Sequence, residues 1–111
     1  MDQRYVQVMT TGGSREEADR LSAVLLERRL AACVQVIGPI ASRYWWKGRL
    51  ESAREWLCLI KTRADRFDEV AEAIRANHSY EVPEITALPV EAASPDYLQW
   101  LGDEVPAEPA S

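Results

Sequence analysis

The hydrophobic and polar positions along the chain follow two periods in turn. Segments with strand-like alternation and many β-branched or aromatic residues predict strands at residues 5–11, 32–46, 50–62 and 84–90. Segments with apolar residues at helical spacing predict helices at residues 14–30, 65–77 and 94–101. The predicted order is therefore strand, helix, strand, strand, helix, strand, followed by a short terminal helix.

Turn residues shape the predicted strands. Gly38-Pro39 interrupts the second strand, because proline cannot donate a ladder hydrogen bond, and this predicts a bent strand with a bulge. Lys47-Gly48 turns the chain back into the third strand, which makes a long hairpin. Pro89 places the fourth strand at a sheet edge.

Residues at the ends of the elements set the domain boundaries. Ser14 and Glu17 have the spacing of a capping box, and Asp65 is expected to cap the second helix. Residues 102–111 contain two prolines and several polar residues, and we expect a disordered tail there. Residues 1–101 are predicted to form a single α+β domain, a ferredoxin-like βαββαβ sandwich with two helices on one face of the sheet.

The third strand is apolar on both of its faces. Side chains alternate across a strand, so Trp56, Cys58 and Ile60 point one way while Leu57 and Leu59 point the other. Two helices can cover only one of these faces, so we predict that copies of the chain cover the other as an oligomer. The alternative is that the terminal helix or the surroundings of the fourth strand cover it.

Composition and charge exclude several classes of partner. The 111 residues suit one domain, and a net charge of -5 without a long Lys/Arg run argues against nucleic acid. No apolar run reaches transmembrane length and the start lacks a secretory signal, so we expect a cytoplasmic protein without membrane contact. Cys33 and Cys58 form no CxxC pair and are expected to be reduced.

Five motifs in register resemble the CutA-type divalent-cation tolerance family. They lie at residues 29–34, 44–51, 60–63, 78–85 and 96–101. The resemblance implies a ferredoxin-like subunit in a tight homotrimer, similar in architecture to the PII signalling proteins. It also implies an association with tolerance to divalent metals, copper in particular, and no established catalytic reaction.

The chain departs from the copper site proposed for some members of that family. Those members use a Cys at the end of the first strand and a His-His pair, where this chain has Thr10 and Asn77-His78. Only His78 matches, so a tight copper site of that type is in doubt.

His78 is the candidate metal ligand and the only histidine. Imidazole suits Cu(II) and Zn(II), but one His needs help from Glu81, Glu84 or a neighbouring subunit. The alternative is a linker histidine that is hydrogen-bonded to the backbone. We therefore expect at most weak binding of copper or another divalent cation, and no organic cofactor.

Two further features are weighed against ordinary structural roles. Cys33 and Cys58 lie at similar distances from the Gly48 turn, so we expect them to approach each other across the hairpin. They either bind Cu(I) as thiolates or, as we favour, are small core residues. Residues 10–14 join a strand to a helix start, where backbone N–H groups either hold an anion or, as we favour, form a turn and cap.

The aromatic hairpin supplies the last candidate. Trp45 and Trp46, flanked by Arg43, Lys47 and Arg49, either stack a flat anionic ligand in an intersubunit cleft or, as we favour, pack in an interface.

No catalytic pair is evident. The glutamates are scattered, and no two of them are fixed as an acid–base pair: Glu51, Glu55, Glu81, Glu84 and Glu91. We therefore predict a trimeric copper-tolerance protein that is not an enzyme. The alternative is a PII-like module that binds a small anionic ligand at intersubunit clefts, and a small hydrolase or isomerase is the least favoured.

Overall fold

The computed structural model describes residues 4–107, in the predicted order of elements. The strands are β1 (Tyr5–Gly12), β2 (Cys33–Trp46), β3 (Arg49–Arg63) and β4 (Thr86–Pro89). The helices are α1 (Arg15–Glu27), α2 (Phe67–Asn77) and α3 (Pro95–Glu104).

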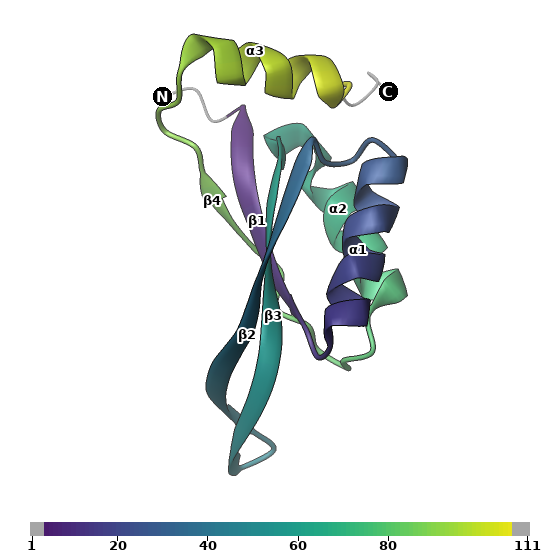
Figure 1. Cartoon of the computed structure of the whole chain (residues 1–111), viewed down its shortest axis with the longest axis vertical. Coiled ribbons are helices and arrows are strands. Elements are labelled where there is room, and N and C mark those ends of the chain that lie inside the picture. The colour runs from purple at the N-terminus through teal and green to yellow at the C-terminus, as the bar shows by residue number, and fades with distance from the viewer. Residues whose placement is uncertain (1–3, 108–111) are drawn as a thin grey trace.

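The strands form one antiparallel sheet in the order β2-β3-β1-β4. Helices α1 and α2 lie side by side against one face of it (Figure 1). The core between sheet and helices is made of buried aliphatic side chains, among them Val8, Leu21, Ile60, Val70 and Ile74. This confirms the ferredoxin-like α+β sandwich, and the position of β4 confirms that Pro89 lies in an edge strand.

The β2–β3 hairpin projects past the helices at one end of the molecule (Figure 1). Its register shifts between Ile37 and Ile40, where the Gly38–Pro39 peptide bond is cis, and this confirms the predicted bulge. The indole of Trp56 packs so closely on Gly38 that a Cβ there would lie 2.4 Å from Trp56 Cδ1. The bulge therefore requires glycine.

The start of α2 corrects one prediction. A 3-10 turn at Ala64–Arg66 leads into the helix, which has no side-chain cap. Asp65 does not cap it, because its carboxylate instead accepts hydrogen bonds from the guanidinium of Arg63, with 3.2 Å between Arg63 Nε and Asp65 Oδ1. Asp65 lies inside the 3-10 turn, and Arg66 occupies the N-cap position of α2.

The predicted tail is wrong over its first residues. Helix α3 continues to Glu104, and Val105 after it is fully buried, as is Leu101 one turn earlier. The carboxylate of Glu104 pairs with Arg29 across 2.8 Å, which ties the helix end to the loop after α1. The domain therefore extends at least to Val105, and the predicted disorder of residues 108–111 lies outside the described residues.

The second face of the sheet is largely uncovered, as predicted. Helix α3 crosses only its end (Figure 1), where Gly102 approaches the hydroxyl of Tyr5. By the strand registers, one face carries an apolar patch that we call the open-face patch: Met9, Ile37, Leu57, Leu59 and Leu88. None of these five side chains is fully buried. No helix in residues 4–107 is long and apolar enough to cross a membrane.

Candidate functional site

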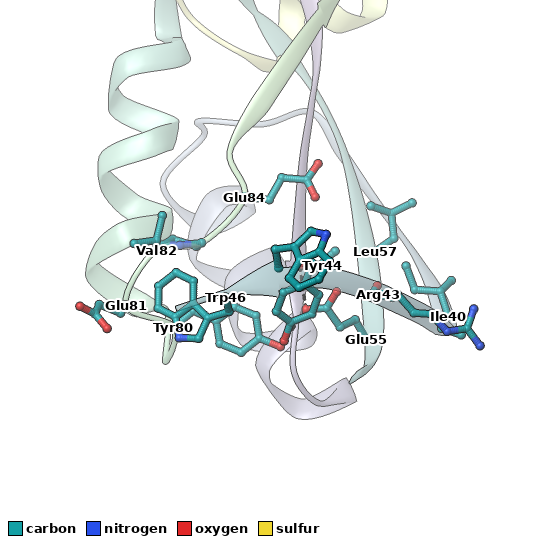
Figure 2. A pocket seen from close by; sticks show the side chains of 15 residues that line it. Ile40, Arg43, Tyr44, Trp46, Glu55, Leu57, Tyr80, Glu81, Val82 and Glu84 are labelled. Carbon is teal, nitrogen blue, oxygen red and sulfur yellow. Dashed lines mark hydrogen bonds between the residues drawn. The ribbon is translucent and has the colours of Figure 1, made fainter. Parts of the chain in front are cut away.

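A cleft of about 840 Å³ lies on the open face at the base of the projecting hairpin (Figure 2). Strands β2 and β3 form its floor, and the segment from Tyr80 to Glu84 forms one wall. Tyr44 and Trp46 share this face and Trp45 lies on the other, as the alternation of side chains predicts. The cleft is within the size range of small-molecule sites.

A buried carboxylate lies in the floor of the cleft. Glu55 is only 6% exposed, and its Oε2 accepts hydrogen bonds from the Tyr80 hydroxyl at 2.8 Å and from Thr11 Oγ1 at 3.2 Å. Within residues 4–107, no Lys or Arg forms an ion pair with Glu55. Two neutral hydroxyls therefore hold this carboxylate without a compensating charge.

Tyr80 acts as a permanent donor to Glu55. Burial, and then the hydrogen bond and negative charge of Glu55, raise the pKa of the Tyr80 phenol far above its ordinary value of 10. The hydroxyl therefore stays protonated at neutral pH and is not a base.

Both ring nitrogens of His78 bind the chain itself. Nε2 donates to the Thr11 carbonyl oxygen at 2.6 Å, and Nδ1 accepts from the Tyr80 N–H at 3.0 Å. The side chain is 0% exposed. Since Nδ1 accepts an N–H, the ring is neutral with its proton on Nε2.

This arrangement leaves His78 without an available lone pair for a metal. Ligation would require the ring to break one of its two bonds and reach solvent. The cysteine position of the copper site is taken by Thr10, which is buried, and Asn77 donates to the Ala73 carbonyl at 2.8 Å. In the described part of the chain, no three His, Cys, Asp or Glu side chains converge as a metal-binding group, so Glu81 and Glu84 do not complete a site around His78.

The loop from Thr10 to Ser14 holds an internal anion. Ser14 caps α1 by accepting the N–H of Glu17 at 3.1 Å, as predicted. Glu17 turns back and accepts the N–H of Gly13 at 2.8 Å and that of Ser79 at 2.7 Å. Its own carboxylate thus takes a place that an external anion would need.

Glu17 keeps its charge although it is buried. Desolvation alone would raise the pKa of this carboxyl, but the N–H groups of Gly13 and Ser79 outweigh burial and lower it. The carboxylate joins the loop after β1 to the segment after α2, and so fixes the position of His78 and Tyr80.

The two cysteines do not approach each other. Cys58 pairs with Val36 and Cys33 pairs with Lys61, so they lie on opposite faces of the sheet. This corrects the expected approach. The one-residue shift at the bulge between Ile37 and Ile40 pairs Cys33 with Lys61 instead of Thr62, and so moves it to the face opposite Cys58, three residues from the partner of Cys58. Burial raises the pKa of the Cys58 thiol to about 11, so it is not a thiolate at neutral pH.

The hairpin aromatics are exposed, and charged side chains of both signs lie around them. Trp45 is 73% exposed, and Trp46 lies under the ammonium of Lys47, which also pairs with Glu81 at 3.6 Å. Among the charged side chains that line the cleft, three are carboxylates and one is a guanidinium: Glu55, Glu81, Glu84 and Arg43. This lining gives no support to the anionic ligand that was the less favoured alternative for Trp45 and Trp46, and their packing in an interface stays a prediction.

Sequence reasoning missed the pairing of Glu55 with Tyr80. Glu55 was one of several scattered glutamates, and the two residues are 25 positions apart. The one signal in the sequence was a charged residue beside the apolar centre of the third strand, where a carboxylate is unusual. Glu51 and Glu91 do not line the cleft.

Comparisons with known proteins give one family. The family model described as "CutA1 divalent ion tolerance protein" matches residues 6–104. A divalent-cation tolerance protein CutA of Archaeoglobus fulgidus is 42% identical over 98 residues, which cover 88% of this chain and 95% of that protein. The chain spans about half, 54%, of the length of the relatives from Oryza sativa subsp. japonica and Xenopus laevis.

Solved structures agree with these relatives. The crystal structure of CutA1 from Oryza sativa superposes with a TM-score of 0.92 at 36% identity, covering 95% of this chain and 96% of that chain. A second match is a structure from Archaeoglobus fulgidus, described as the periplasmic divalent cation tolerance protein CutA. It superposes with a TM-score of 0.89 at 40% identity, covering 92% of this chain and 99% of that chain.

Proposed function

The chain belongs to the CutA1 divalent ion tolerance family, and from this premise we propose that it acts in tolerance to divalent cations, copper in particular, as a cytoplasmic homotrimer. The observation that carries the proposal is the match from residue 6 to residue 104, which includes the strands and helices of the described chain except Tyr5 at the start of β1. We propose a role without catalysis, because the site residues are engaged in holding the chain together.

A growth assay tests the tolerance role. A bacterial strain that lacks its own CutA is transformed with this chain and grown over a series of copper concentrations. We expect the chain to raise the copper concentration that halts growth, relative to an empty vector. Growth curves that coincide at every copper concentration, with the protein confirmed in the cell extract, contradict the proposal.

The homotrimer is supported by surface that one chain leaves open. The open-face patch lies at the centre of the sheet, and each large apolar side chain buried there contributes roughly 1.5–3 kcal/mol. A second copy supplies apolar cover of matching chemistry, whereas α3 reaches only the end of the sheet.

Sedimentation equilibrium at micromolar protomer concentration tests this assembly. We expect a mass of three chains for the wild type and a lower mass for Leu59→Lys, which puts a charge in the centre of the patch. Glu72→Lys, on the exposed face of α2, is the control for added positive charge and should keep the wild-type mass. A monomeric wild type removes the proposal.

Metal ligation at His78 stays a prediction. It requires the ring to give up the Thr11 carbonyl or the Tyr80 N–H, so we propose weak binding at most. Copper titration of the wild type and of His78→Ala decides the matter, because equal affinities exclude His78 as a ligand.

The cytoplasmic location is a separate part of the proposal. Fractionation of cells that express the chain tests it, and recovery in the periplasmic fraction contradicts it. Three carboxylates and one guanidinium line the cleft, and this charge balance disfavours the anionic ligand of the PII-like alternative.

A further inference from the structure

The cleft at the base of the hairpin has the features of a ligand site that the tolerance role does not use. Its floor holds a carboxylate that is almost completely buried, and its walls carry aromatic rings (Figure 2). A buried charge is costly unless a partner compensates it. The chain supplies Glu55 with two hydroxyl donors and no cation among the described residues.

One oxygen of Glu55 remains available. Thr11 and Tyr80 both donate to Oε2, and no residue between 4 and 107 donates to Oε1. Oε1 is also not among the fully buried side-chain atoms that lack a partner, so it keeps some exposure to solvent, and Glu55 lines the cleft. A ligand with an N–H donor can therefore reach it without displacing either hydroxyl.

The walls favour a positive and organic ligand. Figure 2 shows Tyr44, Trp46 and Tyr80 gathered around Glu55, and aromatic faces attract cations that lie over them. The carboxylate of Glu84 at the wall adds to the negative potential, whereas Glu81 is paired with Lys47 at 3.6 Å, and the Lys47 ammonium over the Trp46 ring shows that this ring already accepts a cation. An inorganic divalent ion fits less well, because no three metal-ligating side chains converge in residues 4–107.

We propose that this cleft binds a small organic cation, whose ammonium group donates to Glu55 Oε1 and whose carbon skeleton rests against Tyr44 and Trp46. The proposal goes beyond metal tolerance and does not depend on it. Leu57 belongs both to the cleft lining and to the open-face patch, so in an oligomer the ligand lies at a boundary between subunits.

Calorimetric titration of the assembled protein with a matched set of probes tests the proposal. Benzylamine carries an ammonium group on a flat ring, benzyl alcohol is its neutral counterpart, and benzoate is the anion. We expect benzylamine to bind about tenfold or more tightly than either of the others, as a charge-assisted hydrogen bond predicts. Benzoate binding as tightly as benzylamine, or no binding of benzylamine at all, overturns the proposal.

Variants locate the site. Glu55→Gln keeps an oxygen acceptor for Thr11 and Tyr80 but removes the charge, so benzylamine affinity should fall about tenfold or more. Glu72→Gln makes the same change of net charge on the exposed face of α2 and should change affinity less than twofold. Wild-type affinity in Glu55→Gln refutes the assignment.

Two more measurements distinguish benzylamine binding in this cleft from an effect of misfolding and from binding of inorganic cations. If circular dichroism shows that Glu55→Gln does not fold, Trp46→Leu on the partly exposed hairpin decides instead, and unchanged benzylamine affinity in that variant overturns the proposal. Excess copper should leave benzylamine affinity unchanged. If copper displaces benzylamine, the cleft is a site for inorganic cations and the proposal is wrong, whatever the growth assay shows.

Discussion

Replacing Glu17 with glutamine should loosen the segment that carries His78 and Tyr80. The carboxylate is 4% exposed and accepts two backbone N–H groups, from Gly13 at 2.8 Å and from Ser79 at 2.7 Å. These contacts join the loop after β1 to the segment after α2. Glutamine has almost the same shape, so the change tests charge and hydrogen bonding rather than packing.

The magnitude follows from the geometry around Glu17. A glutamine side chain has one acceptor oxygen and an NH₂ group, so one of the two N–H groups must face a donor. Hydrogen bonds to a charged group contribute about 1.5–3 kcal/mol each, and leaving a buried N–H without a partner costs about 1–3 kcal/mol. We therefore expect the free energy of unfolding to fall by about 2–4 kcal/mol at pH 7.

The pH dependence gives the sign of the charge effect. The pKa of Glu17 in the folded protein is below its ordinary value of 4.5. Its contribution to stability is therefore complete above about pH 4.5 and is lost as the pH falls through the lower folded value. The stability difference between wild type and Glu17→Gln should be constant near neutral pH and should shrink in acid.

Urea unfolding followed by tryptophan fluorescence measures both quantities. The protomer concentration is held fixed, because assembly shifts apparent stability. Glu16→Gln, an exposed neighbour in the first turn of α1, is the matched control and should change stability by less than about 0.5 kcal/mol. A loss below that value in Glu17→Gln, or a loss that stays constant down to about pH 3, refutes the reasoning.

Three further substitutions test the packing around the site. Gly38→Ala should destabilise by about 1–3 kcal/mol in urea unfolding, because its Cβ would lie 2.4 Å from Trp56; an unchanged midpoint contradicts this contact. Val105→Ala should cost about 2 kcal/mol by the same measurement, whereas a disordered residue 105 would give no change. Tyr80→Phe should lower the free energy of unfolding by about 1.5–3 kcal/mol, because Glu55 loses a hydroxyl donor. An unchanged free energy of unfolding would show that water replaces the hydroxyl.

Local patterns determined the elements of this protein. Period-two and helical spacing located all four strands and all three helices of residues 4–107, and Gly38-Pro39 and Pro89 marked the bulge and the edge strand. These features depend on neighbours in the chain, so their physical causes can be read from short segments. The unequal cover of the two sheet faces followed from the same alternation.

Local reasoning failed at several positions. Asp65 has the residue type of a helix cap, but it lies inside a 3-10 turn and its carboxylate accepts from Arg63, only two residues away. Val105 stands alone among polar residues and prolines, so nothing in its neighbourhood reveals that it is buried. Cys33 and Cys58 lie on the predicted strands, yet the one-residue shift at the bulge between Ile37 and Ile40 places them on opposite faces of the sheet.

The candidate site depended entirely on tertiary structure. The sequence identified His78 as a residue with metal-binding chemistry, and folding directs both of its nitrogens to the chain. Glu55 was one glutamate among several until β1, β3 and the segment after α2 brought Thr11 and Tyr80 to it. The periodicity of the sequence predicts the face of a strand or helix on which a side chain lies. Which hydrogen-bond donor contacts which acceptor from a distant part of the sequence depends on the tertiary packing.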